Sequence, residues 1–393
     1  MSSDSIVIGA AKRTPLGAFQ GALGGAQAPE LGATAIRASI EGTGVDARDI
    51  GEIIFGCVLP AGVGQAPARQ AALAAGIPLS TGCTTLNKVC GSGMKATMLG
   101  HDIIKAGSAR MVMAGGMESM TNAPYLLPKA RGGFRMGHQE ALDHMFFDGL
   151  QNPYDGNMMG HFAEQTAQLY KFSRQDQDAF AIESVNRALH AMAGGAFDAE
   201  IAPITIKTRK GEVTVSEDEA PGNVNIDKIP VLRPAFSKDG TVTAASSSSI
   251  SDGAAALLLM SGSYAQAQGV TPLATIVGHA SFAHEPEWFT TAPVSAINAL
   301  HAQLGWTPDN VDLYEINEAF AVVTMAAMQD VGIDHGKVNV NGGACALGHP
   351  IGATGARIIV TLVHALRSRG KNRGVASLCI GGGEAVAIGI EIN

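Results

Sequence analysis

A strand–helix alternation that occurs twice along this chain of 393 residues is the feature that most constrains its fold. In the first half, short apolar runs typical of buried strands alternate with segments of helical periodicity. Alternation of this kind predicts an α/β fold. The predicted strands are residues 6–10, 52–58, 83–89 and 111–116, and the predicted helices are residues 29–40, 66–75 and 94–106.

The same alternation restarts at residue 274 and runs to the end of the chain. In both halves a glycine-containing junction connects a strand to a helix, at residues 87–93 and again at 339–343. The repeat is approximate but ordered, so the two halves are predicted to be copies of one unit. The predicted strands are residues 274–280, 312–316, 338–343 and 375–383, and the predicted helices are residues 294–304, 319–330 and 354–369.

Residues 121–250 separate the two halves and differ from them in composition. They contain 28 of the 62 charged residues together with Pro and Gly breakers, which is typical of an exposed elaboration with lid and binding loops. Residues 243–260 return to a buried strand that is expected to rejoin the first half. The expected domains are residues 1–120 completed by 251–272, an inserted segment of 121–250, and residues 273–393.

Composition and charge exclude several function classes. Only 16% of the residues are charged while 46% are apolar, which favours a surface covered by subunit contacts. The net charge of -8 gives no basic footprint for a nucleic acid or an anionic membrane, so neither partner is expected. The first fifteen residues lack the pattern of a signal peptide, and no run of 18 apolar residues occurs, so we expect a cytoplasmic protein.

The five cysteines are odd in number and lack ligand spacing, so neither a disulfide framework nor a zinc site is suggested. One of them, Cys90, ends an apolar strand and precedes Gly91-Ser92-Gly93 and a helix. The free N–H groups and positive dipole end of a helix N-terminus lower the pKa of a thiol, which favours a nucleophile. The alternative is a buried structural cysteine.

His349 lies in a glycine-rich loop, Gly342 to Gly355, directly before a predicted helix. Such a loop presents an imidazole to a cleft with little steric cost, and Pro350 fixes the backbone beside it. The alternative is a phosphate-binding loop. It is disfavoured because neither a Lys-Ser/Thr pair nor an acidic residue follows the glycines at the required distance.

Two further strand ends carry polar or reactive groups. Cys379 precedes three glycines that include Gly381, and the N–H groups of such a turn form an oxyanion hole, although a structural thiol is the alternative. Asn317 and Glu318 begin a predicted helix, where helix capping and a dipole contact are the alternatives to a catalytic role. All these junctions converge if the two halves pack as a pseudo-twofold pair.

Four motifs together resemble the thiolase family, and the similarity extends along essentially the whole chain, including residues 115–119 and 251–256. The resemblance is closest to the members that condense acetyl-CoA. It implies two half-folds that form a five-layered αβαβα core, a loop domain inserted in the first half, and assembly into a tetramer built from two dimers. The motifs are residues 87–96, 317–321, 341–357 and 379–385.

The resemblance also implies roles for the residues of these motifs. Cys90 is the nucleophile that accepts the acyl group, and His349 is the base that forms its thiolate. Cys379 is a second acid and base for the α-carbon of a second acyl-CoA. Asn317, through a bound water, and His349 stabilise the enolate oxygen, while the N–H groups of Cys90 and Gly381 form a second oxyanion hole.

The same resemblance places the coenzyme A and acyl groups along one wall. Ser248 lies where the family contacts the pantetheine, and Phe236 and Phe320 match the apolar wall. Met159 and Ala244 complete the expected substrate contacts. CoA and acyl-CoA act as substrates in this family, and neither a metal nor a redox cofactor is implied.

This chain departs from the family pattern at three places that concern the CoA and acyl contacts. Met158 occupies the usual position of a histidine in the loop domain. Phe289 occupies the position of the methionine that commonly lines the pantetheine tunnel. No arginine is evident beside Gly222, where the family contacts adenine.

The expected reaction is the reversible condensation of two acetyl-CoA to acetoacetyl-CoA and CoA, through S-acetyl-Cys90, within fatty acid metabolism. The alternative is a degradative thiolase for longer 3-ketoacyl-CoA or 3-oxoadipyl-CoA, favoured by the altered residues 157–161 and 284–290. A ketoacyl synthase has no need of Cys379. A non-catalytic acyl-CoA- or lipid-binding homologue is expected to have lost Cys90 or His349, and both are present.

Overall fold

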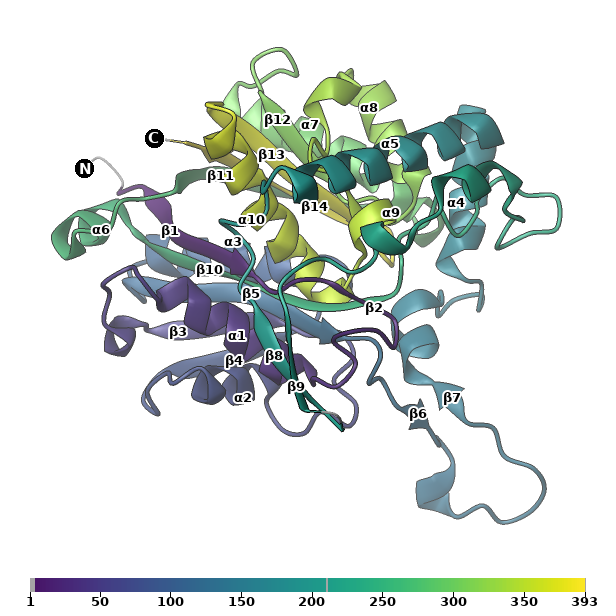
Figure 1. Cartoon of the computed structure of the whole chain (residues 1–393), viewed down its shortest axis with the longest axis horizontal. Helices are drawn as coiled ribbons and strands as arrows, with labels where there is room; N and C mark the ends of the chain where they lie inside the picture. The colour runs from purple at the N-terminus through teal and green to yellow at the C-terminus, as the bar shows by residue number, and fades with distance from the viewer. Residues whose placement is uncertain (1–3, 210, 393) are drawn as a thin grey trace.

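The first half of the chain folds as a sheet in which four strands run in one direction and one strand runs against them. The computed structural model describes residues 4–209 and 211–392 (Figure 1). The strand order is β4-β3-β5-β10-β1, in which β10 runs antiparallel to both of its neighbours. The strands are β1 (Ile6–Arg13), β3 (Glu52–Gly56), β4 (Gly82–Leu86), β5 (Met111–Ser119) and β10 (Ser251–Ser261), and the helices are α1 (Ala28–Ile40), α2 (Pro67–Ala74) and α3 (Ser92–Lys105).

The second half repeats this order without the outermost strand, as β12-β13-β14-β11, with the same relative strand directions. The strand predicted at residues 338–343 is wrong: only Val338 forms a bridge, to Tyr314. The chain turns instead at Asn339 (φ 46°) and Gly342 (φ 82°). The strands are β11 (Ala274–Ala283), β12 (Leu313–Ile316), β13 (Arg373–Ile380) and β14 (Glu384–Glu391), and the helices are α7 (Ala292–Leu304), α8 (Ala321–Val331) and α10 (Ile351–Ser368).

The two sheets enclose a shared layer of helices, which confirms the five-layered α/β arrangement (Figure 1). Helices α3 and α10 pack against each other and against strands of both sheets, while α1 and α2 cover one outer face and α7 and α8 the other. The sheets also meet edge to edge, because β1 pairs with β11 through Ile6–Ile8 and Ala274–Ile276. Cores of branched aliphatic side chains on both sides of α10 hold these layers together.

Helices α3 and α10 approach so closely that glycine is required at their contact. A Cβ atom on Gly355 would lie 2.4 Å from the backbone nitrogen of Met94, and one on Gly93 would lie 2.7 Å from the nitrogen of Ala356. Both distances are far below van der Waals contact. The N-terminal ends of the two helices are therefore held side by side at the centre of the molecule.

The segment between the halves contains a projecting arm and two long helices (Figure 1). Strand β10 then enters the first sheet between β1 and β5, so residues 251–261 rejoin that half. The predicted domain boundaries stay predictions, and their ends at residues 1–3 and 393, like residue 210, lie outside the described residues. The elements of the segment are β6 (Tyr125–Leu126), β7 (Leu142–Asp143), the π-helix η3 (Met145–Leu150), α4 (Met159–Tyr170), α5 (Arg174–Ala193), β8 (Ile204–Thr208) and β9 (Gly211–Val215).

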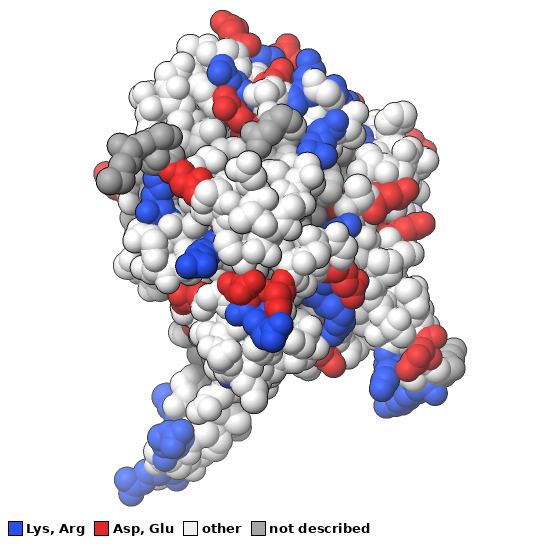
Figure 2. Space-filling model, turned by 90° about the vertical axis from the view of Figure 1, so that its left-hand side faces the viewer, with Lys and Arg blue, Asp and Glu red and all other residues white. Residues whose placement is uncertain are grey.

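Short elements complete the chain. They are β2 (Gly17–Ala18), α6 (Gly262–Gln268), α9 (Ala344–Leu347) and the short 3₁₀ helices η1 (Ala47–Asp49), η2 (Ala130–Gly132), η4 (Pro221–Asn223), η5 (Ile226–Val231), η6 (Pro286–Thr291) and η7 (His335–Lys337). None of the described helices combines the length and the hydropathy that a membrane span needs. Acidic and basic side chains are interspersed over the face shown in Figure 2, so this face carries no continuous basic surface.

A buried ion cluster ties the segment between the halves to β1. Arg13 is fully buried, and its Nε lies 2.6 Å from Glu200 Oε1 while its Nη1 lies 2.7 Å from Asp218 Oδ1. A second bond of 2.8 Å from Nη2 to Asp218 Oδ2 makes this pair bidentate. Arg13 is 187 residues from Glu200 and 205 residues from Asp218 along the chain, so the cluster fixes the segment onto the first sheet.

Candidate active site

The predicted catalytic residues meet at the strand ends and helix starts near the centre of the molecule. Cys90 lies just before α3, and His349 lies just before α10. Asn317 directly follows β12, and its Nδ2 lies 3.4 Å from His349 Nε2. Cys379 lies in β13 and interacts electrostatically with Cys90. The structure therefore brings together side chains from both halves.

A tight turn places Cys90 at the start of α3. Val89 adopts a left-handed conformation, with φ at 47°, which is unusual for a β-branched residue. Ser92 stabilises the turn, because its Oγ accepts from the Lys88 N–H at 2.8 Å and donates to the Val89 carbonyl at 2.7 Å. Cys90 is half-buried and packs against a small apolar cluster that contains Met120.

Burial, rather than the helix dipole, dominates the acidity of Cys90. Burial raises the pKa of this thiol to about 11, although the Gly381 N–H and its own N–H donate to the sulfur and oppose the rise; the negative charge of Glu118 adds to it. The expectation of a lowered thiol pKa at the helix N-terminus is therefore wrong. Two N–H donors do not compensate for the loss of water around the sulfur. The resting thiol is neutral and needs a base.

His349 is a neutral imidazole whose orientation is set by its neighbours. The Thr354 hydroxyl donates to the Pro350 carbonyl at 2.9 Å and so accepts from His349 Nδ1 at 2.6 Å. This assigns the ring proton to Nδ1 and leaves Nε2 with a lone pair. Burial lowers the pKa of His349 to about 3, and the positive charge of Arg357 adds to this effect. His349 is thus a free base throughout the neutral pH range.

Asn317 is not a helix cap, in contrast to one alternative from the sequence. Helix α8 begins at Ala321, and its N-cap residue is Phe320. The Asn317 N–H donates to the Ser377 carbonyl at 3.0 Å, which fixes the residue against β13. Its Oδ1 is buried and has no hydrogen-bond partner among the described residues. A buried amide of this kind requires a specific explanation.

Glu318 forms hydrogen bonds that hold the glycine-rich loop before His349 in place. Its buried carboxylate accepts from Asn339 Nδ2 at 2.8 Å, Ser184 Oγ at 2.7 Å and the Cys345 N–H at 3.0 Å. Burial raises its pKa, whereas the hydrogen bonds act in the opposite direction. The sequence did not decide between a catalytic role and a dipole contact for Glu318. In the structure it lies in a hydrogen-bond network that positions residues before His349.

Cys379 is completely buried opposite Ala385 of β14. Burial raises its pKa, and a negative charge on Cys90 raises it further. Gly381 follows β13 and donates its N–H to the Cys90 sulfur. Because a Cβ there would lie 3.7 Å from Met159 Sδ, this glycine faces the wall of the neighbouring cavity.

A cavity of about 360 Å³ leads from His349 outward between the halves and the segment that separates them. Its wall is almost entirely apolar. Ser248 is fixed there, because its N–H and Oγ both donate to the Ala319 carbonyl, at 3.0 and 3.1 Å. All the residues predicted to contact substrate line this cavity: Ser248, Phe236, Phe320, Met159 and Ala244.

The three departures from the family pattern have different outcomes. Met158 lines the cavity. Phe289 is not among the residues that line this cavity: its ring is buried and packs against Phe162, with ring centroids 6.3 Å apart. Gly222 belongs to η4, beside a second cavity of about 320 Å³ that shares Ala244 with the first and contains Lys228 as its basic side chain.

Glu118 is a site residue to which the sequence assigned no role. Its buried carboxylate accepts from the N–H groups of Val58 at 2.9 Å, Leu59 at 3.1 Å and Gly352 at 2.8 Å. Burial raises its pKa to about 7, although these N–H groups oppose the rise. Glu118 thus ties the loop beside Cys90 to the first turn of α10. The only signal was its place in the motif at residues 115–119.

Comparisons with known proteins agree along the whole chain. The family model for the thiolase N-terminal domain matches residues 6–263, and that for the thiolase C-terminal domain matches residues 270–392. The chain is 49% identical over 385 residues to an acetyl-CoA acetyltransferase of Pseudomonas aeruginosa, covering 98% of each protein. It is 48% identical to acetyl-CoA acetyltransferase 2 of Arabidopsis thaliana, covering 99% of this chain and 97% of that protein.

Solved structures show the same similarity. The acetyl-CoA acetyltransferase of Bacillus anthracis superposes with a TM-score of 0.97 at 41% identity, covering 100% of this chain and 99% of that chain. A thiolase from Ascaris suum in complex with coenzyme A superposes with a TM-score of 0.94 at 43% identity, covering 99% of this chain and 100% of that chain.

Proposed function

This chain belongs to the thiolase family, and we propose that it is an acetyl-CoA acetyltransferase, which reversibly joins two acetyl-CoA into acetoacetyl-CoA and CoA. The observation that carries the proposal is the meeting of a neutral thiol, a neutral imidazole and a second buried thiol beside one apolar cavity. Claisen chemistry needs this set, because one group must hold the acyl unit while another deprotonates a weakly acidic carbon.

In the proposed first step, Cys90 attacks the thioester carbonyl of acetyl-CoA as His349 Nε2 takes the thiol proton. The N–H groups of Cys90 and Gly381 stabilise the oxyanion. The bond between carbon and the CoA sulfur breaks, and Cys379 donates its proton to the leaving sulfur. This leaves S-acetyl-Cys90, an imidazolium and a Cys379 thiolate. The raised thiol pKa values support proton transfer within the site rather than thiolates at rest.

In the proposed second step, the Cys379 thiolate removes an α-proton from a second acetyl-CoA. The imidazolium N–H at Nε2 stabilises the enolate oxygen, together with a water held by Asn317. The unpartnered Oδ1 of Asn317 supports this water. The enolate carbon attacks the acetyl carbonyl, the bond to Cys90 breaks, and His349 returns its proton to the Cys90 sulfur. All three groups end in their initial protonation states, and no redox cofactor or metal is needed.

We propose that the pantetheine arm lies in the apolar cavity beside Ser248, Phe236 and Phe320. The second cavity continues from Ala244 toward η4 and suits the nucleotide end of CoA. Lys228 there would meet a phosphate group of CoA, whereas no arginine stands beside Gly222, where the family contacts adenine.

Two cysteine variants test the proposed division of roles. Cys90→Ser should abolish covalent acetylation by acetyl-CoA, measured by mass spectrometry of the intact protein. Cys379→Ser should still become acetylated, more slowly because the acid for the leaving sulfur is lost, but should fail to exchange the α-proton of acetyl-CoA with solvent deuterium. The control is Cys83→Ser, which replaces a half-buried thiol outside the site and should behave as the wild type. Equal loss of acetylation in Cys90→Ser and Cys379→Ser would contradict the proposal.

The degradative alternative is favoured by one observation, the apolar side chains of Met158, Phe146 and Leu150 along the cavity. CoA-dependent thiolysis of acetoacetyl-CoA, 3-ketohexanoyl-CoA and 3-ketodecanoyl-CoA distinguishes the two. We expect the fastest cleavage at four carbons. A preference for longer chains would establish the alternative. 3-Oxoadipyl-CoA should be a poor substrate, because neither lysine nor arginine occurs among the described residues that line the cavity.

We also propose a cytoplasmic homotetramer that acts in fatty acid metabolism. The low share of charged residues, 16%, and the exposed apolar side chains on the arm around β6 and β7 support subunit contacts. They include Tyr125, Leu127, Phe134 and Met136. Light scattering after size-exclusion chromatography should give four times the chain mass, and a monomer would contradict this assembly.

A further inference from the structure

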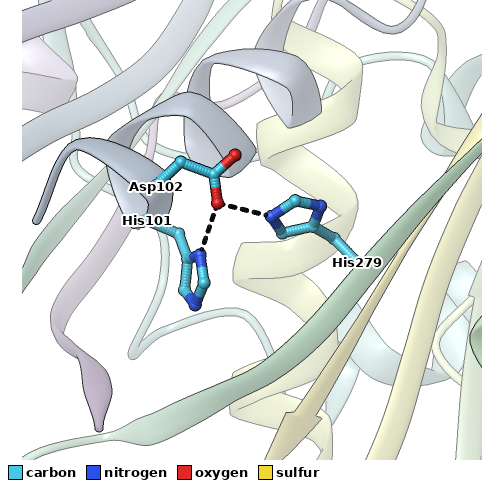
Figure 3. A group of neighbouring side chains, drawn as sticks. All are labelled: His101, Asp102 and His279. Carbon is cyan, nitrogen blue, oxygen red and sulfur yellow. Dashed lines mark hydrogen bonds and ion pairs between the residues drawn. The ribbon is translucent and has the colours of Figure 1, made fainter. Parts of the chain in front are cut away.

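Two histidines and an aspartate form a compact cluster between the two halves, outside the proposed active site (Figure 3). His101 and Asp102 lie on α3, and His279 lies on β11. Asp102 Oδ1 is 2.9 Å from His101 Nδ1 and 2.9 Å from His279 Nε2. One ligand atom from each residue falls within 4.8 Å of the others.

We propose that His101, Asp102 and His279 form a zinc-binding site that links α3 of the first half to β11 of the second. Two imidazoles and one carboxylate are a donor set that Zn²⁺ uses in proteins, with a water as the fourth ligand. At Zn–ligand distances of about 2.0–2.1 Å, tetrahedral ligand atoms lie roughly 3.3 Å apart. The two separations from Asp102 Oδ1 are 2.9 Å and need to widen by a few tenths of an ångström, while the two histidine nitrogens lie within 4.8 Å of each other and would adjust by rotation of their side chains.

The surroundings of the cluster suit a metal that enters from solvent. The side chains of His101 and His279 are 16% and 20% exposed, which limits their motion, while that of Asp102 is 51% exposed and leaves room for water. The rings of the two histidines are nearly perpendicular, at 89°, so their nitrogens approach the carboxylate from different directions. The positive charge of Lys105 acts on His101 and opposes a bound cation, which limits the affinity of the site.

The protonation states of His101 and Asp102 also agree with metal binding. Burial lowers the pKa of His101, so its ring is neutral near pH 7, as a ligand must be. Burial acts to raise the pKa of Asp102, but the hydrogen bonds from both histidines outweigh it and lower the pKa. The carboxylate is therefore ionised. Zinc would replace the two hydrogen bonds to Asp102 and move the ring protons to His101 Nε2 and His279 Nδ1.

The location gives the site a structural role. Cys90 precedes α3, and His101 lies nine residues after Ser92, the first residue of this helix, which at 1.5 Å per residue is roughly 14 Å along the helix axis. Zinc would therefore not contact the reacting atoms. It would fasten the helix that begins beside Cys90 to a strand of the other half. Sequence spacing could not reveal this set, because 177 residues separate Asp102 from His279.

Calorimetric titration of the metal-free full-length protein with ZnCl₂ tests the proposal. We expect one zinc per chain, with binding weakened at least tenfold in His279→Gln and in Asp102→Asn. The matched control is His190→Gln, which removes an exposed histidine at the end of α5 and should bind zinc as the wild type does. The thiolysis rate without zinc should be unchanged in all three variants, which shows that they are folded.

Cobalt provides a second readout that separates this site from the cysteines. Co²⁺ bound by nitrogen and oxygen ligands should show tetrahedral d–d absorption without a thiolate-to-cobalt charge-transfer band. Zinc should also raise the melting temperature of the wild type but not that of His279→Gln. Absence of saturable binding, or binding that is equal in His279→Gln and the wild type, would overturn the proposal. In that case the cluster is a hydrogen-bonded His–Asp–His contact only.

Discussion

At the scale of single residues, the site rests on two groups that are both neutral at rest. Burial raises the pKa of Cys90 to about 11 and lowers that of His349 to about 3. The cause is the same for both, because removal from water disfavours a thiolate and an imidazolium alike. A proton can then pass from sulfur to nitrogen only when a substrate stabilises the resulting charges. Neutral resting groups protect the thiol from unwanted reaction.

This neutrality predicts the pH dependence of Cys90 alkylation by iodoacetamide. Because its pKa is raised to about 11, the thiolate fraction should increase about tenfold for each pH unit between pH 7 and 10. The rate, followed by mass spectrometry of the Cys90 peptide, should increase in parallel without reaching a plateau. A rate that is already constant at pH 7 would indicate a thiolate–imidazolium pair and contradict the prediction.

The tether on His349 gives a second prediction at this scale. Thr354→Val removes the acceptor for Nδ1–H, so the ring loses its fixed proton position. An unmade buried hydrogen bond costs about 1–3 kcal/mol, which corresponds to a decrease in kcat of roughly 5- to 150-fold. Thr97→Val is the matched control, because the Thr97 hydroxyl bonds only within α3, to the Gly93 carbonyl. Steady-state kinetics should separate the two variants, and equal kcat values would disprove the tether.

Some of these residues could be predicted from the sequence and others could not. Cys90, His349 and Cys379 each stand beside glycines at a strand or helix end, and the structure places them together. Glu118 was not assigned a role, because the N–H groups that donate hydrogen bonds to its carboxylate belong to residues about 60 and 234 positions away. Likewise, the pKa values of the Cys90 and Cys379 thiols depend on how deeply each is buried, which a local motif does not reveal.

At the scale of elements, the contact between α3 and α10 determines where the catalytic loops lie. Both helices begin next to a catalytic residue, and glycines allow their backbones to touch. The periodicity predicted both helices within a few residues of their observed bounds. It failed at residues 338–343. The apolar residues of this segment are typical of a strand, but the segment forms only one β-bridge, and two of its residues have positive φ.

The helix contact predicts a large effect of a single methyl group. Gly355→Ala places a Cβ 2.4 Å from the Met94 backbone nitrogen, so the two helices must separate. Overpacking of this kind costs about 1–3 kcal/mol. We expect a lower midpoint of chemical denaturation and a lower thiolysis rate, because Cys90 and His349 move apart. Gly132→Ala, in open space, is the control and should leave both unchanged. An unchanged Gly355→Ala protein would show that the helices are not in tight contact.

At the scale of the whole molecule, two repeated halves and one segment between them were recognisable from the alternation alone. The five-layered packing followed from the family resemblance. The attachment of the segment was not predictable, because Arg13, Glu200 and Asp218 have no shared motif and meet only in the folded chain. Their complete burial makes the cluster a connection between distant parts of the fold.

This cluster predicts the stability of the whole chain. Arg13→Met leaves two carboxylates buried without their cation and should lower the free energy of unfolding by about 3–5 kcal/mol. Arg48→Met breaks an ion pair whose side chains are 79% and 41% exposed, and should leave the free energy of unfolding nearly unchanged because solvent screens the pair. Equilibrium denaturation in urea compares the two. Similar losses in both variants would refute a special role for the buried cluster.

The left-handed backbone of Val89 affects the stability and the catalytic rate of this protein in opposite directions. That conformation costs roughly 1–2 kcal/mol for a residue with a Cβ, and glycine would adopt it freely. A laboratory selection for heat resistance alone should therefore favour Val89→Gly. The same change would remove a side chain that packs against the core and would loosen the turn that aims Cys90. Selection for catalytic rate should retain valine, so the two selections would favour different residues at this position.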